Sequence, residues 1–290
     1  MQKPETTAEL NLPPEQDSVG KALKRSANPR HFINLFGRAA KCAKERGGEA
    51  LVREASYRVD LMTKGESWQF RADVPLKREL RAQRKQVFDV MPLISVVVPL
   101  YNTNLSYLRA MIKSVLQQSY QHFELVLVDA SGPAYGNVAN AVKKFSDRRI
   151  VLCKLAQNAG IAANTNIGFG EATGDYIALL DHDDTLSPNA LYEVVCAIND
   201  ENADFIYSDE IILDDAMKNL GEYHFKPDFS PDTLRGCNYI THLSVFSRTL
   251  LDAIGGDERT EMNGAQDYDL ILRLTEKAQH VVHIPKVLYY

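Results

Sequence analysis

The sequence predicts an α/β protein with a mixed, mostly parallel sheet flanked by helices. After Pro92, short runs of apolar, β-branched residues alternate with amphipathic segments of about 10–15 residues, the pattern of parallel βαβ units. The apolar runs have few polar positions, which is typical of strands buried on both faces. The 290 residues are 45% apolar and 24% charged, so the chain can bury a sizeable core.

The expected elements follow in order along the chain. The first buried strand is 93–98, LISVVV, and Pro99 ends it. In the segment 105–118, Leu108, Ile112 and Val115 recur at helical spacing and predict a helix. Further strands are expected at 123–129, 150–155, 176–180 and 204–207, and further helices at 137–145, 160–172 and 188–199.

The front of the chain differs in charge from the remainder. Residues 1–90 carry 18 Lys and Arg against 12 Asp and Glu, a net charge of +6, whereas 91–290 carry a net charge of −11. We expect a flexible arm at 1–19, a basic helical region at 20–90 with a helix candidate at 76–86, and one large domain after it. The acidic charge of that domain disfavours nucleic acid as a partner.

The composition also indicates in which cellular compartment the protein is expected. The chain has no run of about 18 apolar residues that could span a membrane as a helix. The N-terminus, MQKPETTAEL, is polar and unlike a signal peptide. The four cysteines are far apart and form no CxxC pattern, which excludes a disulfide scaffold or a zinc ribbon. A cytoplasmic protein is expected. Its basic region 20–90 either lies on the inner face of the membrane or packs on the domain or a partner.

A cluster of acids, Asp181-His182-Asp183-Asp184, follows the fourth expected strand. Ligands of open α/β sheets bind beyond the carboxyl ends of the strands. Asp181 and Asp183 could face one ligand, since residues i and i+2 of an extended chain point the same way. Carboxylates with phosphate oxygens suit Mg²⁺ or Mn²⁺, so a metal–diphosphate site is one interpretation. An acidic turn that caps the next helix through Asp183, Asp184 and Thr185 is the other.

A second acid of interest lies in the segment GAQDYDLILRL. On a helix with about 100° per residue, Asp267 shares the inward face with Leu270 and Ile271. Asp269 falls on the opposite face and is expected to pair with Arg273 at i+4. Asp267 therefore either caps the helix or serves as a base in a cleft.

Five segments in this order resemble the family 2 glycosyltransferases of the GT-A fold: SVVVPLYN, ELVLVDAS, QNAGIAANTN, GDYIALLDHDD and GAQDYDLILRL. The later segments YSDE, FKPDFSPD, NYITHL and HIPKVLYY resemble a bacterial branch that builds surface polysaccharides such as O-antigens and rhamnose-containing glycans. The resemblance covers residues 92–290 and implies a GT-A, Rossmann-like domain at 91–290. It also implies metal-dependent, inverting transfer of a hexosyl or rhamnosyl group. The donor would be a nucleoside-diphosphate sugar, UDP- or dTDP-linked, and the acceptor a glycan or polyprenyl-linked oligosaccharide.

The resemblance implies roles for individual residues. Asp267 would be the general base, and Asp183 would hold the Mn²⁺ or Mg²⁺ ion, with His283 near the metal. Donor contacts are implied for Pro99, Tyr101, Asn102, Asp129, Asn158, Gly160, Asp181 and His182. Acceptor contacts are implied for Asp209, Glu210 and Gln266.

The sequence departs from the family pattern at three places. Ala130 replaces a second acid, Gln266 replaces a glutamate, and the chain ends at Tyr290, where a further C-terminal segment is expected. A non-catalytic module that binds nucleotide sugar or glycan is the first alternative function. A sugar nucleotidyltransferase is the second, but it needs a Gly-rich loop after the first strand, where this chain has PLYNTNL. His242 is expected to be a satisfied core histidine.

Overall fold

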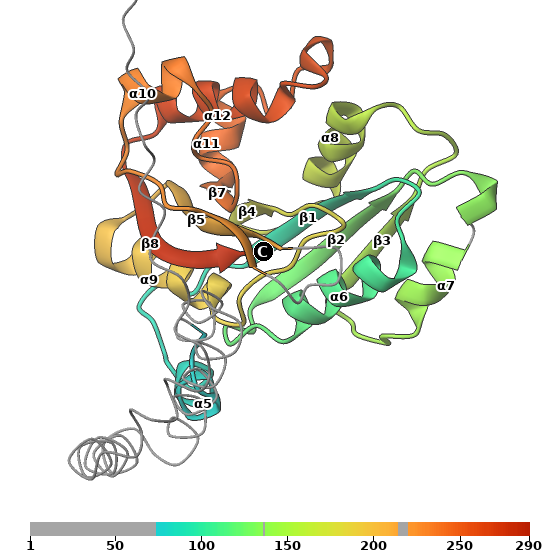
Figure 1. The fold of residues 1–290 in the computed structure, drawn as a ribbon, viewed down its shortest axis with the longest axis horizontal. Coiled ribbons are helices and arrows are strands. Elements are labelled where there is room, and N and C mark those ends of the chain that lie inside the picture. Colours follow the sequence, from blue (N-terminus) through green and yellow to red (C-terminus); the bar gives the residue numbers. More distant parts are fainter. Residues whose placement is uncertain (1–73, 136, 214–219) are drawn as a thin grey trace, which may run out of the picture. The chain divides into compact units, whose positions relative to one another are not determined.

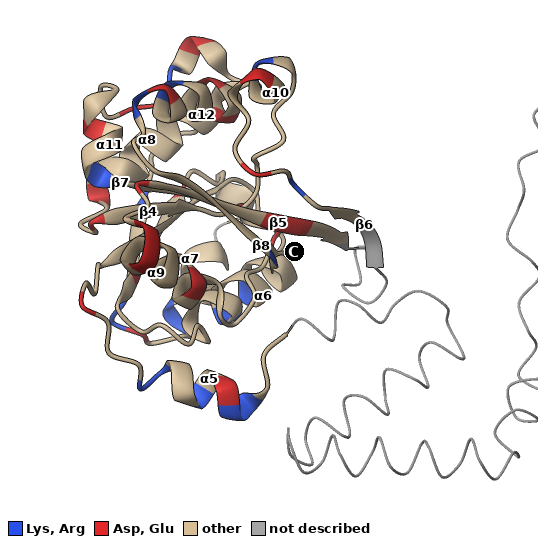
Figure 2. Ribbon diagram, turned by 90° about the vertical axis from the view of Figure 1, so that its left-hand side faces the viewer, with Lys and Arg blue, Asp and Glu red and all other residues tan. Residues whose placement is uncertain are grey.

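The computed structural model describes residues 74–135, 137–213 and 220–290. The chain divides into two units, Met1–Ala72 and Asp73–Tyr290, and every described element belongs to the second. The expected arm at 1–19 and most of the basic region at 20–90 therefore lie outside the described residues. Within the helix candidate 76–86, helix α5 (Lys77–Gln83) confirms the prediction, and its lysines and arginines are visible in Figure 2.

The described residues form a mixed sheet of eight strands (Figure 1). The strands are β1 (Ile94–Leu100), β2 (Phe123–Asp129), β3 (Ile150–Lys154), β4 (Tyr176–Leu179), β5 (Phe205–Leu213), β6 (Leu220–His224), β7 (Ser244–Ser247) and β8 (Val281–Tyr289). Their order is β3-β2-β1-β4-β7-β5-β6, and β8 also pairs with β5. The first four are mutually parallel, β7 is antiparallel to β4 and β5, and β8 is parallel to β5. The predicted fold class is confirmed.

Helices cover both faces of this sheet. They are α6 (Leu105–Leu116), α7 (Asn137–Lys143), α8 (Ile161–Glu171), α9 (Ala190–Glu201), α10 (Pro231–Gly236), α11 (Arg248–Ala253) and α12 (Gln266–Lys277), with 3-10 turns η1 (Pro133–Tyr135) and η2 (Thr260–Met262). Helices α6, α7 and α9 lie on one face, and α8, α11 and α12 on the other (Figure 2). None of the helices in the described part of the chain is long and apolar enough to cross a membrane.

Successive residues of a strand point to opposite faces of the sheet, so their side chains pack in two separate cores. Val96 and Val98 of β1 pack in the core under α6 and α9, whereas Val97 packs in the core under α8 and α12. Helix α8 approaches β1 so closely that a Cβ on Gly168 would lie 2.5 Å from Cγ1 of Val97. Glycine at this position therefore allows α8 to pack close against β1. The first turn of α8 reaches the site described below.

The expected strands and helices of 93–207 are all present, with ends that differ by a few residues. Strand β5 is longer than expected and runs to Leu213. Strands β6, β7 and β8 have no counterpart among the expected elements. The parallel strands bring their carboxyl ends to one edge of the sheet, where Leu100 pairs with Asp129 and β4 ends at Leu179.

Candidate active site

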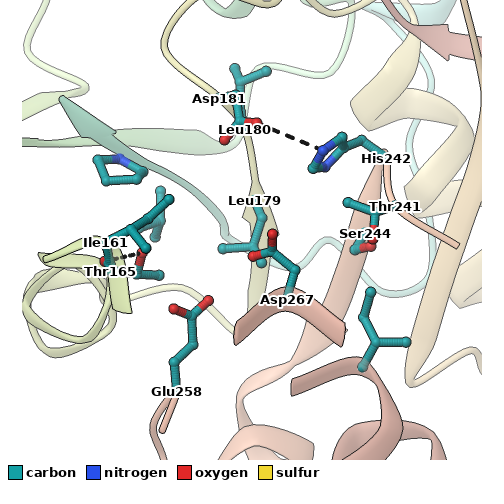
Figure 3. A pocket seen from close by; sticks show the side chains of 13 residues that line it. Ile161, Thr165, Leu179, Leu180, Asp181, Thr241, His242, Ser244, Glu258 and Asp267 are labelled. Carbon is teal, nitrogen blue, oxygen red and sulfur yellow. Dashed lines mark hydrogen bonds and ion pairs between the residues drawn. The ribbon is translucent and has the colours of Figure 1, made fainter. Parts of the chain in front are cut away.

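Two adjoining hollows lie at this carboxyl edge. The inner pocket, with a cavity volume of about 20 Å³, is bounded by β1, β4, α8, the loop before β7 and the start of α12 (Figure 3). The outer cleft, with a cavity volume of about 350 Å³, is bounded by the end of β1, the start of α8 and the loop after β4. Pro99, Ile161 and Asp181 line both hollows, so the two hollows adjoin.

Four of the predicted donor contacts shape the outer cleft beside the acidic loop. Pro99, Tyr101 and Asn158 line it, and the ring of Tyr101 is half exposed and free to stack on a flat ligand. Oδ1 of Asn158 accepts hydrogen bonds from the backbone N–H of Gly160 (3.0 Å) and from Nδ2 of Asn164 (2.8 Å). Gly160 precedes α8 with φ = 97°, a conformation that favours glycine. These contacts set the wall opposite the acidic loop.

Two other predicted donor residues do not line the outer cleft. Asn102 joins the loops after β1 and β2, since its Oδ1 accepts from the N–H of Gly132 at 3.2 Å. Asp129 is fully buried, and its Oδ2 lies 2.8 Å from Nζ of Lys154 at the end of β3. Its Oδ1 accepts from the N–H of Ser131. Lys154 was not expected at the site. A direct contact of Asp129 with a nucleotide base stays a prediction.

The acidic loop after β4 divides into exposed and paired acids. The side chains of Asp181 and Asp183 are 47% and 55% exposed and line the outer cleft with His182. Nδ1 of His182 is buried, lacks a hydrogen bond, and lies 3.6 Å from Oδ1 of Asp183. Asp184 is turned away and accepts a 2.6 Å hydrogen bond from the hydroxyl of Tyr289. Burial raises the pKa of Asp184 to about 6, against the lowering effect of that hydrogen bond.

The capping interpretation of this loop is wrong. Helix α9 begins at Ala190 after Asn189, and no side chain caps it. Asp183 and Asp184 therefore do not cap α9.

Asp267 lies on the wall of the inner pocket, as the helical projection requires. Leu270 and Ile271 of the same face are buried, and Asp269 pairs with Arg273 at 2.8 Å, as expected. Ala265 occupies the N-cap position and no side chain caps α12, so Asp267 is not a cap. Burial, with the nearby charge of Asp181, raises the pKa of Asp267. A carboxyl group with raised proton affinity facing a pocket suits a base.

Gln266 supports this carboxylate from the neighbouring position. It is buried, its Oε1 accepts from the N–H of Gly264 at 2.7 Å, and its Nε2 donates to Oδ2 of Asp267 at 3.3 Å. The structure thus gives Gln266 a role in orienting Asp267, while direct contact with an acceptor stays a prediction.

The expectation that His242 is a core histidine is wrong. Its ring lines the inner pocket, stacks on Tyr289 at 4.8 Å, and places Nε2 3.7 Å from Oδ2 of Asp181 (Figure 3). The error came from the apolar neighbours of His242, whose segment is a loop before β7. Glu210 accepts a hydrogen bond from the N–H of His242, and Nζ of Lys226 donates to the carbonyl oxygen of His242. Burial lowers the pKa of Lys226 to about 8.

The remaining predicted residues form a polar cluster behind the pocket. Nε2 of His283 lies 2.9 Å from Oδ1 of Asp209, and its Nδ1 lies 3.3 Å from Oδ1 of Asp228. Asp209 is buried and also accepts from the N–H of Lys226. Both ring nitrogens of His283 therefore already face carboxylates, and metal ligation by His283 stays a prediction. Acceptor contacts of Asp209 and Glu210 stay predictions as well.

One pocket residue, Glu258, was missed by the sequence analysis. It is 1% exposed, lines the inner pocket with Asp267, and its Oε2 has no hydrogen-bond partner. Burial, together with the charge of Asp267, raises its pKa to about 8. An isolated glutamate in the loop between α11 and η2 belongs to no periodic pattern, so no sequence signal marks it as buried.

The family model for glycosyl transferase family 2 matches residues 95–252, more than half of the chain. The chain is 37% identical over 202 residues to the O-antigen biosynthesis protein RfbC of Myxococcus xanthus, covering 69% of this chain and 16% of that protein. It is 42% identical over 203 residues to the uncharacterized protein y4gI of Sinorhizobium fredii, covering 68% and 22%. The chain thus spans about a fifth of the length of these relatives.

Solved structures are similar in fold. The S. aureus protein TarS in complex with UDP superposes with a TM-score of 0.58 at 19% identity, over 68% of this chain and 59% of that one. The mannosyltransferase PcManGT from Pyrobaculum calidifontis, in complex with GDP-Man and Mn²⁺, gives 0.52 at 18%, over 73% and 62%. These likenesses assign the GT-A fold. The family model, which matches more than half of the chain, shows that the chain belongs to glycosyltransferase family 2.

Proposed function

We propose that the protein transfers a sugar from a nucleoside-diphosphate sugar to a glycan acceptor, with a divalent metal and inversion at the anomeric carbon. The observation that carries the proposal is that two differently built hollows adjoin and share Pro99, Ile161 and Asp181 as lining residues. The outer cleft offers an exposed aromatic ring and two exposed carboxylates, Asp181 and Asp183. The inner pocket offers a partly buried carboxyl group, Asp267. A donor in the cleft and an acceptor that reaches the mouth of the pocket with a hydroxyl group would meet at Asp181.

The residues of the acidic loop fit a magnesium or manganese ion. No cluster of three or more metal-ligating side chains exists in the described residues, but such an ion in a nucleotide site needs one or two carboxylates and takes phosphate oxygens from its substrate. Asp183 is the residue proposed to hold it. The ion would stabilise negative charge on the departing diphosphate, which can supply several kcal/mol.

The protein's own groups account for the other half of the reaction. Asp267 accepts the proton of the attacking acceptor hydroxyl as the bond from that oxygen to the anomeric carbon forms and the bond to the diphosphate breaks. The raised pKa of Asp267 makes it a stronger base than an ordinary aspartate. A single base suffices for inversion, because no covalent intermediate has to be resolved.

The acceptor class is inferred from the relatives. RfbC is named for O-antigen biosynthesis, and the E. coli protein WcaA, 29% identical over 212 residues, is named as a putative colanic acid biosynthesis glycosyl transferase. A growing surface polysaccharide, free or on a polyprenyl carrier, is the acceptor proposed here. Peripheral contact with the inner face of the membrane through residues 20–90 belongs to the same proposal.

The test is release of nucleoside diphosphate by the purified chain from UDP-, dTDP- and GDP-sugars, with Mn²⁺ or Mg²⁺ and a pool of oligosaccharide acceptors. Metal-dependent release that Asp267→Asn abolishes would support the proposal and identify the donor. Nucleotide binding without release would favour the non-catalytic binding module. Absence of nucleotide binding would contradict the roles given to Tyr101 and Asp183.

A further inference from the structure

Glu258 presents a buried polar atom to the pocket without a partner. Its side chain is 1% exposed, and its Oε2 accepts no hydrogen bond from the protein. Figure 3 shows the carboxyl groups of Glu258 and Asp267 directed into the same space between α8 and α12. Leaving a buried polar group unpaired is costly, so natural structures seldom do so unless a ligand or water completes the site.

The backbone of Glu258 is held firmly in this position. Its N–H donates to Oδ1 of Asn166 at 2.7 Å, and Nδ2 of Asn166 donates back to its carbonyl oxygen at 2.8 Å. Arg273 of α12 donates to the carbonyl oxygen of the preceding residue, Asp257, at 2.9 Å. The loop is thus tied to α8 and to α12, and the carboxyl group is aimed by secondary structure rather than by a free loop.

A second unpaired polar atom lines the same pocket. Oγ of Ser244, at the start of β7, is buried and has no partner. Two unpaired oxygens from different elements, Oε2 of Glu258 and Oγ of Ser244, thus face a pocket that has room for a small polar group such as one hydroxyl of a ligand. A purely apolar occupant would leave both unsatisfied.

We propose that Glu258 is an acceptor-recognition residue, whose carboxyl group hydrogen-bonds a hydroxyl of the acceptor sugar beside the hydroxyl that Asp267 deprotonates. The inference rests on the proposed function. Glu258 lines the inner pocket with Asp267 and does not line the outer cleft, where Asp183 lies, which places its ligand on the acceptor side. Its high pKa, about 8, leaves the carboxyl group neutral at pH 7, able to donate a hydrogen bond without repelling Asp267.

The test separates acceptor binding from donor chemistry. Wild type, Glu258→Gln and Glu258→Met are compared in transfer to p-nitrophenyl glycosides of glucose, galactose, mannose and rhamnose, and in donor hydrolysis without acceptor. Glu258→Met is expected to raise the acceptor KM about tenfold, with donor KM and donor hydrolysis unchanged, because the methionine is similar in size and lacks the hydrogen bond. Glu258→Gln keeps a donor and an acceptor and is expected to stay near the wild type.

Two further variants keep the test decisive. Glu261→Met makes the same change at an exposed position of the neighbouring turn and is expected to have no effect. Glu258→Asp keeps a carboxyl group but withdraws it by one methylene, so it is expected to raise the acceptor KM even if the methionine variant fails to fold.

The acceptor hydroxyl beside the attacking one gives the sharpest readout. A deoxy glycoside that lacks it is expected to lose affinity for the wild type but not for Glu258→Met, as a double-mutant cycle requires for a direct contact. Unchanged acceptor KM in Glu258→Met and Glu258→Asp would overturn the inference and leave the proposed function intact. Loss of donor hydrolysis in step with transfer would overturn the acceptor-specific role. A wild type that transfers to no acceptor and hydrolyses no donor would overturn the proposed function itself.

Discussion

The site contains two pairs of acids in opposite surroundings. The open pair, Asp181 and Asp183, is about half exposed, so solvent screens its charge. The closed pair, Asp267 and Glu258, lines the inner pocket, and burial raises the pKa of both. Without a bound cation, the open pair therefore costs the folded state little stability. The closed pair reduces stability, and a ligand would relieve that cost. One half of the site thus keeps its charges in solvent, whereas the other half keeps its carboxyl groups out of solvent at a cost in stability.

Replacement of the proposed base, Asp267, is expected to cause a large loss of activity without a loss of stability. Asp267→Asn should lower kcat by about 10²–10⁴-fold, the usual contribution of a positioned base. It should not lower the free energy of unfolding, since it removes a buried carboxyl group near the charge of Asp181. Initial rates and urea denaturation measure these two quantities, and nucleotide binding shows whether the donor site stays intact. Asp252→Asn, an exposed acid of α11, is the control. A large loss of stability in Asp267→Asn would place Asp267 among the structural acids.

The pH dependence of stability should report on Glu258. Its pKa is about 8 in the folded protein, where Asp267, Asp181, Asp269 and Arg273 also act on it, against an ordinary 4.5. Between these values the folded state holds a proton that the unfolded chain has released, so the free energy of unfolding falls as pH rises.

The expected contribution is a few kcal/mol between about pH 5 and about pH 8. Glu258→Gln removes this contribution, whereas Asp184 and Asp267 titrate in both proteins. Urea denaturation across this range, wild type against Glu258→Gln, measures the difference. Parallel pH profiles would show that Glu258 does not hold a proton in the folded protein.

Replacement in the open pair should affect activity alone. Asp183→Asn is expected to lower metal-dependent transfer on the order of 10²-fold and to weaken the response to added Mn²⁺. The free energy of unfolding should change by no more than about 0.5 kcal/mol, because the side chain is mostly exposed. Metal titration of the rate and thermal denaturation check both. A protein that works at full rate with a chelator present would contradict the assignment.

The smallest expected effect concerns the acid that belongs to neither pair. Tyr289→Phe removes the hydroxyl that donates to Asp184 and accepts from the N–H of Asp181. It should destabilise the fold by about 1 kcal/mol, because Asp184 loses its partner. Denaturation of the single variant and of Tyr289→Phe with Asp184→Asn measures the coupling. Additive losses would show that the hydrogen bond contributes nothing.

The sequence predicts the parallel half of this fold well and the antiparallel half poorly. Strands β1 and β2 are buried on both faces, so nearly every residue is apolar and the signal is local. Strand β7 has four residues, and its pairing with β4 and β5 joins segments far apart in the chain. Such pairing depends on tertiary contacts that periodicity does not record.

The candidate site divides in the same way. Asp181 and Asp183 directly follow a recognisable strand, and Asp267 lies on a periodic helix, so their places could be predicted. Glu258 and His242 lie in irregular loops, where burial depends on the neighbours that the fold brings. For His242, apolar neighbours in the sequence indicated a core, but Lys226 and Glu210 hold its loop at the pocket.

The last described strand also has a consequence for the order of events during synthesis. The hydroxyl of Tyr289 fastens the acidic loop, and Thr185 and Tyr290 exchange two backbone hydrogen bonds. The loop leaves the ribosome about a hundred residues before these partners, a delay of at least several seconds at usual rates. A nascent chain that already contains the acidic loop therefore still lacks the two residues that fasten this loop. The acidic loop is fastened only after β8 has been made and has paired with β5.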